Sequence, residues 1–282
     1  MRSAAVSASP PLEGLRVVDL TSYIAGSYAA MMLADLGADV IKVEPPSGDE
    51  ARGFGPPFLG GEGMNFMALN RGKRSIVLDL KRDEDRRTAH RLIETSDVLV
   101  ENFRPGVTER LGIDPATARR LNPRLVYCSI TGFGTSGPYR DRPALDLILQ
   151  GMGGVMHRQG RGGRPQLVVI TIADCYAAAL AVQAILAALY ARTRDGRGQL
   201  VEVDLFRSLV FSQAYRILTG AGEVRLAAWE DVCPYGPFRG KDGRWFNVAV
   251  VTERTWSAFC EAIGAPDLAR DPRFATNRDR VQ

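Results

Sequence analysis

The sequence has few cysteines and lacks the apolar segments that mark secreted or membrane proteins. Residues 1–12 have no apolar core, so we expect no signal peptide. The longest apolar run, Cys175–Ala191, is shorter than the roughly 20 residues that a membrane span needs. The four cysteines stand far apart among apolar neighbours, which disfavours disulfide scaffolds and metal sites: Cys128, Cys175, Cys233 and Cys260. We therefore expect a soluble, cytoplasmic protein that binds no membrane and no metal.

Lysine is also scarce. The 36 basic residues include only four lysines, and they exceed the 32 acidic residues by a formal charge of +4, with a pI near 9.0. Arginine presents a planar fork of donors that suits phosphates and carboxylates. No basic stripe with interleaved aromatic residues is present, so we expect no nucleic-acid partner. With 45% hydrophobic residues, the composition is that of a globular protein and excludes a disordered chain.

Nucleotide-binding fingerprints are missing as well. The first predicted strand is followed by Ala25-Gly-Ser-Tyr-Ala29 in place of G-x-G-x-x-G, and no Walker sequence occurs. A nicotinamide dehydrogenase is therefore disfavoured. No period of 20 to 50 residues repeats, which argues against a solenoid.

Strands and helices are predicted to alternate over the first 210 residues or so. The predicted strands are Arg16–Leu20, Asp39–Glu44, Ser75–Leu80, Asp97–Glu101, Leu125–Ile130, Leu167–Ile172 and Leu200–Leu205. The predicted helices are Ala25–Leu36, Asp83–Thr95, Pro115–Leu121, Leu145–Gly151 and Asp174–Arg192. This rhythm predicts an α/β fold, a Rossmann-like, mostly parallel sheet with helices on both faces.

A second, smaller α+β domain is predicted after the sheet. A hairpin is expected from Pro234–Phe238 and Trp245–Val250, followed by a helix over Glu253–Ile263. We place the large domain at residues 1–217 and the small one at 218–282.

Two glycine-rich segments could approach a ligand closely, Arg52–Pro57 and Thr131–Pro138. The second follows a strand, and open α/β sheets bind ligands at the carboxyl ends of their strands. Plain turns are an equally good interpretation of both.

Cationic residues gather where predicted strands begin or end. Asn70–Arg74 precedes the third strand, Lys81 follows it, and Asn102–Gly106 follows the fourth with Arg110 just beyond. Together with Phe103 as a stacking surface, these groups suit a ligand with several phosphates and a purine. Scattered surface arginines remain the alternative for any one of them.

Asp174 is the most interesting titratable residue because it joins an apolar strand to an alanine-rich helix. The simplest interpretation is an N-cap that accepts backbone N–H groups of the first turn. A carboxylate at a helix start can also act as a nucleophile, since the N–H groups stabilise a neighbouring oxyanion. Neither His90 nor His157 has an identifiable carboxylate or serine partner, so a serine-hydrolase site is not supported.

Seven segments in register resemble the class III CoA-transferase family (CaiB/BaiF, formyl-CoA transferase-like), which also contains the α-methylacyl-CoA racemases. The matching segments are Pro11–Leu20, Ala34–Glu44, Asn70–Lys81, Val100–Gly106, Ser129–Pro138, Gly196–Gln199 and Asp271–Asn277. The resemblance implies a homodimer of interlocked chains and no tightly bound cofactor, with coenzyme A and acyl-CoA as substrates. It also implies an aspartate, here Asp174, that attacks the acyl-CoA to form a mixed anhydride and then an aspartyl-CoA thioester. A carboxylic acid acceptor then takes the CoA.

The resemblance also carries CoA contacts onto this sequence. They are Tyr23, Ile24, Ala25, Leu78, Lys81, Asn102, Phe103, Arg104, Arg110 and Phe133, the last near the thioester. One departure concerns Pro45, which stands where many family members have a CoA-binding arginine.

Two further departures bear on activity. The racemases use a histidine in a Gly-His-Asp triplet, and this chain has Ala144-Leu145-Asp146 there, so a transferase is preferred over a racemase. The chain also ends soon after Asp271–Asn277, where the family normally continues. It is expected to be a fragment or a naturally short relative, and a non-catalytic CoA-binding protein is the alternative function.

Overall fold

The computed structural model describes residues 9–160, 163–214 and 232–281. The chain forms two compact units, residues 1–212 and residues 213–282. The boundary that the sequence predicts, between residues 217 and 218, lies outside the described residues.

The first unit is built on a six-stranded sheet in which all five strand pairs are parallel. The strand order is β5-β2-β1-β6-β7-β8. The strands are β1 (Arg16–Leu20), β2 (Asp39–Glu44), β5 (Lys73–Val77), β6 (Val98–Glu101), β7 (Val126–Thr131) and β8 (Leu200–Asp204). A small antiparallel pair, β3 (Phe58–Leu59) and β4 (Glu62–Gly63), lies outside this sheet. The predicted parallel sheet is confirmed.

Helices connect the strands. In the first unit they are α1 (Ala25–Asp35), the 3-10 helix η1 (Glu50–Gly53), α2 (Met64–Asn70), α3 (Asp83–Glu94), α4 (Val107–Leu111), α5 (Pro115–Leu121), α6 (Asp146–Met152), α7 (Val155–Gln159), α8 (Ile172–Asp195) and α9 (Leu205–Phe211). The elements η1, β3, β4, α2, α7 and α9 had no counterpart among the predicted elements.

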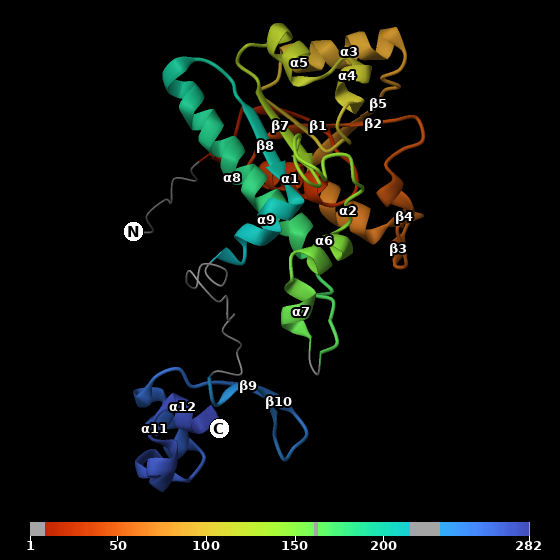
Figure 1. The fold of residues 1–282 in the computed structure, drawn as a ribbon. Helices are drawn as coiled ribbons and strands as arrows, with labels where there is room; N and C mark the ends of the chain where they lie inside the picture. Colours follow the sequence, from red (N-terminus) through yellow and green to blue (C-terminus); the bar gives the residue numbers. More distant parts are fainter. Residues whose placement is uncertain (1–8, 161–162, 215–231, 282) are drawn as a thin grey trace, which may run out of the picture. The chain divides into compact units, whose positions relative to one another are not determined.

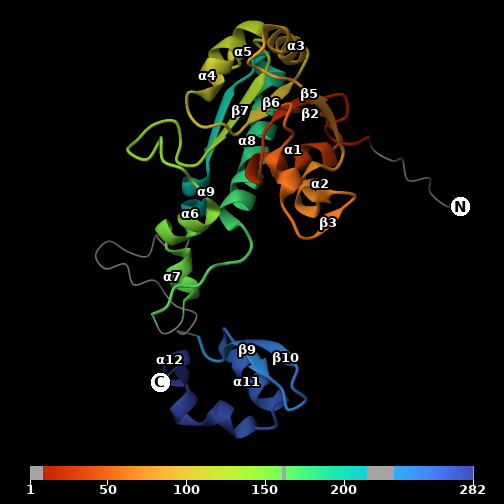
Figure 2. The same ribbon diagram turned by 90° about the vertical axis from the view of Figure 1, so that its right-hand side faces the viewer.

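Each face of the sheet carries its own apolar core. Alternation along β1 sends Val17 into a core with α1 and α8, and Val18 into a core with α3 and α5. Figures 1 and 2 show α1 and α8 on one side of the sheet and α3, α4 and α5 on the other. Helices cover both faces, as the sequence predicted.

Helix α8 is longer than the predicted apolar run. It has 24 residues, and an 18-residue window within it is apolar enough to cross a membrane by length and composition. Its buried residues, among them Ala177, Ala181 and Ile185, belong to the core that also contains β1, β6 and β7. Small alanine side chains let α8 pack closely against α1 and α9.

The predicted strand Leu167–Ile172 is wrong. Residues 167–170 form no strand, and Ile172 is already the first residue of α8. The side chains of Val169 and Ile170 are 90% and 69% exposed. Because β8 runs parallel to β7, α8 must cross from the carboxyl edge of the sheet back to its amino edge, and the segment before α8 stays at the carboxyl edge.

The third predicted strand is shifted. It was expected at Ser75–Leu80, and β5 spans Lys73–Val77. Leu78 donates its backbone N–H to the Glu44 carbonyl at 2.9 Å and then turns away, which leaves Leu78 and Leu80 buried beyond the strand.

The second unit confirms the predicted hairpin and helix. The strands β9 (Tyr235–Arg239) and β10 (Trp245–Ala249) pair antiparallel. Helix α11 (Glu253–Ala262) begins with a capping box formed by Thr252 and Thr255. Two 3-10 helices and a short helix complete the unit: η3 (Pro266–Arg270), η4 (Pro272–Phe274) and α12 (Asn277–Val281).

Candidate active site

A cleft opens at the carboxyl edge of the sheet, beside the ends of β1, β2, β5 and β6. Its volume is about 250 Å³. The chain runs from β1 to β2 on one side and returns to β6 on the other, so the strand order reverses between β1 and β6. Open α/β sheets bind ligands at such a switch point. The cleft is lined by residues 20–22, 42–45, 47–50 and 78–81 and by Phe103 and Leu111.

Three of the predicted CoA contacts line this cleft together: Leu78, Lys81 and Phe103. Asn102 joins the two strands at the switch point. Its Oδ1 accepts the Ser22 N–H at 2.9 Å, and its Nδ2 donates to the Ser22 carbonyl at 2.8 Å. Asn102 therefore fixes the loop after β1 to the loop after β6.

Tyr23, Ile24 and Ala25 continue from Ser22 into α1. Tyr23 has a φ of 61°, a backbone conformation that is unusual for a residue with a side chain. Its hydroxyl donates to the cleft-lining Glu50, and its ring lies 5.5 Å from that of Phe54. Tyr23 is 43% exposed, whereas Ala25 is buried.

The predicted cations are not all gathered in the cleft. Arg104 and Arg110 are exposed, in the loop after β6 and in α4, and neither lines the cleft. Pro45 does line it. Arg52 does not replace the missing arginine, because its guanidinium binds Glu44 through two hydrogen bonds of 2.8 and 2.7 Å.

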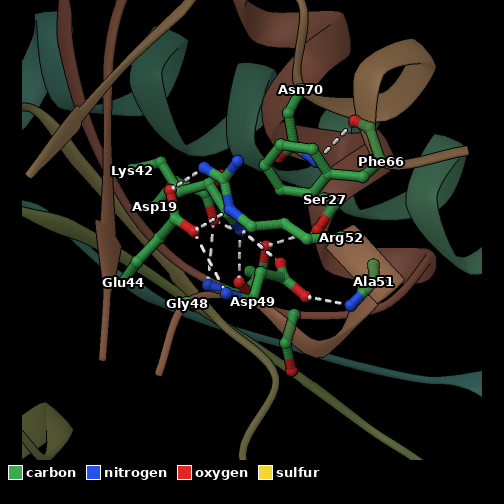
Figure 3. Close-up of polar contacts among 12 residues, drawn as sticks. Asp19, Ser27, Lys42, Glu44, Gly48, Asp49, Ala51, Arg52, Phe66 and Asn70 are labelled. Carbon is green, nitrogen blue, oxygen red and sulfur yellow. Dashed lines mark hydrogen bonds and ion pairs between the residues drawn. The ribbon is translucent and has the colours of Figure 1, made fainter. Parts of the chain in front are cut away.

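Two of the residues that line the cleft, Lys42 and Asp49, are buried charges, and Figure 3 draws both. Lys42 is 2% exposed and pairs with Asp49 at 2.9 Å, while its Nζ also donates to the Thr21 carbonyl at 2.7 Å. Lys73 pairs with the fully buried Asp19 at 2.8 Å. Burial lowers the pKa of Lys73, and the Asp19 carboxylate opposes that change. Each ammonium group thus ties β2 or β5 to the end of β1.

Glu44, also drawn in Figure 3, is a third buried acidic residue. It accepts hydrogen bonds from Arg52, from the Ser75 hydroxyl and from the Asp49 backbone N–H. The Arg52 hydrogen bonds are the main reason why the pKa of Glu44 is about 2. These contacts shape the loop over residues 45–53, which forms one wall of the cleft.

Sequence reasoning missed Lys42, Glu44 and Asp49 as site residues. A signal was available, because Lys42 and Glu44 interrupt an otherwise apolar strand near its carboxyl end. A charged residue in a buried strand needs a partner of opposite charge.

Glu101 is a further buried carboxylate beside the cleft. It ends β6, is 3% exposed, and accepts the Phe103 N–H at 2.8 Å. Burial raises its pKa to about 7.

Phe133 and Asp174 lie outside the residues that line the cleft. Phe133 is buried in the core shared with α1 and α8, and its ring lies 5.8 Å from that of Phe206. Asp174 stands in the first turn of α8, so the predicted N-cap is wrong: the N-cap position is Thr171. Helices between parallel strands begin at the carboxyl edge, so Asp174 shares that edge with the cleft.

The surroundings of Asp174 favour its protonated form. Burial, and then the nearby Asp146 charge, raise the pKa of Asp174 to about 7. Its side chain is only partly buried and accepts no hydrogen bond from the described residues. A carboxylate in this state is reachable, poorly solvated and unpaired, which are properties of functional rather than structural carboxylates.

Comparison with known proteins identifies the family. The model of CoA-transferase family III matches residues 12–282. The chain belongs to this family. Succinate--glutarate CoA-transferase of Agrobacterium fabrum is 41% identical over 96% of this chain and 71% of that protein. Succinyl-CoA:mesaconate CoA-transferase of Haloarcula hispanica is 42% identical over 95% of this chain and 71% of that protein.

Solved structures agree. The structure of a CAIB/BAIF family protein from Brucella suis is 40% identical, with a TM-score of 0.84 over 96% of this chain and 74% of that one. This family III chain is therefore an enzyme, a CoA-transferase that uses CoA thioesters as substrates. The family and the fold predicted from the sequence are confirmed.

Proposed function

We propose that this CoA-transferase moves CoA from an acyl-CoA to a carboxylic acid through covalent intermediates on Asp174. The observation that supports this most directly is the carboxylate itself, which is partly buried, unpaired among the described residues and has a pKa near 7. A poorly solvated carboxylate is a better nucleophile than one fully hydrated in water. The first-turn N–H groups of α8 other than that of Ala173, which donates to Asp146, can stabilise an oxyanion formed beside it.

The chemistry balances as two reversible exchanges. An Asp174 oxygen forms a bond to the thioester carbonyl carbon, the C–S bond breaks, and CoA leaves as thiolate, which gives a mixed anhydride between Asp174 and the donor acid. The thiolate then attacks the Asp174 carbonyl carbon, releasing the donor acid as carboxylate and leaving an aspartyl-CoA thioester. The acceptor carboxylate runs the same steps in reverse, which returns Asp174 as a free carboxylate.

We propose that the cleft holds the nucleotide part of CoA. Lys81, Arg104 and Arg110 offer exposed cations for phosphates, and Phe103 offers a ring for the adenine. The thioester arm would pass over the carboxyl edge beside Tyr23–Ala25 and Phe133 to reach Asp174 on the other face. The carboxyl edge of the sheet connects these two places.

Dicarboxylic acids are the acceptors we propose to test first. The curated relatives are named as transferases of succinate, glutarate, mesaconate and oxalate. The racemase alternative lacks its second base, because Leu145, 63% exposed, has no proton to transfer.

Covalent trapping tests the proposal. The protein is incubated with succinyl-CoA and hydroxylamine, with glutarate as acceptor in parallel, and peptides are mapped by mass spectrometry. We expect a hydroxamate at Asp174 and no transfer by Asp174→Ala. Asp195→Ala, in the last turn of the same helix, is the matched control and should transfer normally.

Modification at another residue, or turnover by Asp174→Ala, refutes the role of Asp174 as the nucleophile. CoA binding without acyl exchange would favour the non-catalytic alternative.

We further propose a homodimer, whose interlocked form is implied by the resemblance. Exposed apolar side chains on α6 and the segment before α8 support a second copy of the chain as the partner: Leu145, Leu147, Ile148, Met152, Leu167, Val169 and Ile170. Sedimentation that gives a monomer at micromolar concentration would contradict this.

A cytoplasmic location is proposed because the four cysteines are free thiols.

A further inference from the structure

The segment before Asp174 has no regular structure to hold it. Residues 167–170 form neither helix nor strand, and Val169 and Ile170 are largely exposed. Helix α8 begins without a side-chain cap from its own N-cap residue, Thr171. A short segment with no regular structure and little burial needs other contacts to keep one conformation.

Helix α6 supplies those contacts through Gln150, which is fully buried. Its Oε1 accepts the Val168 N–H at 3.0 Å, and its Nε2 donates to the Val168 carbonyl at 3.0 Å. One amide side chain thus pairs with both backbone groups of Val168, as a neighbouring strand would do.

The same Nε2 donates to Asp146 Oδ2 at 2.5 Å. The other oxygen of Asp146, Oδ1, accepts the N–H of Ala173 at 2.7 Å. Asp146 therefore supplies to the first turn of α8 the cap that Thr171 does not provide. Ala173 is the residue immediately before Asp174, so this chain of hydrogen bonds ends one peptide unit from the proposed nucleophile.

We infer that Gln150 is a positioning residue for Asp174, holding the segment 168–173 so that the carboxylate faces the acyl-CoA. The inference rests on the proposed role of Asp174. Loss of the Gln150 amide would leave both Val168 backbone groups and one Asp146 oxygen without their partner. The start of α8 would then be free to shift, and a displacement of about 1 Å at a reacting group can cost about 100-fold in rate.

Gln150→Leu tests this, because leucine keeps much of the volume and removes the amide. We expect hydroxamate formation at Asp174 and kcat for transfer from succinyl-CoA to glutarate to fall by about 10- to 100-fold. The dissociation constant for CoA should stay within about twofold, since the cleft residues belong to other elements.

Asn122→Leu is the matched control. Asn122 Nδ2 donates to the carbonyls of Ile93 and Ser96, and its Oδ1 accepts the Arg124 N–H, at the amino edge of the sheet. Asn122→Leu removes three backbone contacts, as Gln150→Leu does when the 3.5 Å bond from Gln150 Nε2 to the Ile170 carbonyl is included. These contacts lie far from Asp174, so the control should lower stability without slowing the labelling of Asp174.

The outcomes separate the two proposals. Absence of label at Asp174 in the unchanged protein refutes the nucleophile. If Asp174 is labelled at the same rate in the unchanged protein and in Gln150→Leu, the positioning role is refuted but the nucleophile is not. The same holds if Asn122→Leu slows the labelling of Asp174 as much as Gln150→Leu does. If Gln150→Leu does not fold, Gln150→Met decides: it keeps the length of the side chain and has no hydrogen-bond donor, so labelling at the original rate overturns the inference.

Discussion

Glu101 provides a test of how this protein tolerates buried charge beside the cleft. Its carboxylate, at the end of β6, receives the Phe103 N–H and a hydrogen bond from the Ser129 side chain. No cation among the described residues forms an ion pair with it. Burial is the main reason why its pKa is about 7, compared with an ordinary value of 4.5.

The sign of the pH effect follows from proton counting. Between pH 4.5 and 7 the folded protein keeps a proton on Glu101 that the unfolded chain has released. Stability therefore falls as the pH rises through this range and levels off above about 7. Each pKa unit corresponds to about 1.36 kcal/mol, so the rise from 4.5 to about 7 lowers the free energy of unfolding by about 3 kcal/mol in total.

Glu101→Gln should remove this loss, because glutamine is neutral and can still accept the Phe103 N–H. We expect the free energy of unfolding to increase by about 1 kcal/mol at pH 5.5 and about 3 kcal/mol at pH 8.5 relative to the unchanged protein. The difference between the two pH values, about 2 kcal/mol, is independent of any constant cost of the substitution.

Urea unfolding followed by circular dichroism at both pH values measures this difference. Glu202→Gln, which removes an exposed carboxylate from β8, controls for the change in net charge. The reasoning is refuted if Glu101→Gln gains the same amount at both pH values, or if Glu202→Gln shows an equal pH-dependent gain.

Three other predictions concern the backbone, the switch point and the nucleophile. Gly198→Ala would place a Cβ 1.9 Å from the Leu125 carbonyl oxygen, so it should cost at least about 2 kcal/mol in urea unfolding, whereas Gly53→Ala, with open space around it, should be neutral within about 0.5 kcal/mol. Asn102→Ala should weaken CoA binding about tenfold, measured by calorimetry, because it releases the two loops that Asn102 joins. An unchanged affinity would show that this link does not contribute to CoA binding. The single-turnover rate should rise with pH through about 7 and then level off, as the Asp174 carboxylate forms; a rate that is flat from pH 5 to 8 would contradict the assignment.

The strands of the sheet were predicted well because their signals are local. Arg16–Leu20 and Asp39–Glu44 are short apolar runs ended by turn residues, and the structure has strands at the same positions. Leu167–Ile172 carries the same kind of apolar run and is not a strand. An apolar run shows only that a segment is able to form a strand; the strand forms when a neighbouring strand in the sheet pairs with it. At the carboxyl edge the Gln150 side chain, not a neighbouring strand, pairs with the backbone of Val168.

The site was predicted in part for a similar reason. Residues that follow strands, such as Leu78, Lys81 and Phe103, could be placed at one edge because parallel strands end together. Lys42 and Asp49 could not, because their pairing depends on the fold of the loop over residues 45–53.

By itself, the sequence determined the α/β class, the family and the edge of the sheet where Leu78, Lys81 and Phe103 line a cleft. These depend on hydrophobic periodicity, on motif order and on the rule that parallel strands share one direction. Tertiary structure alone decided which charges are buried in pairs, that Asp174 lies inside the first turn of α8, and that α6 caps this helix. Those properties arise from desolvation and from contacts between residues distant in the sequence, which no local pattern contains.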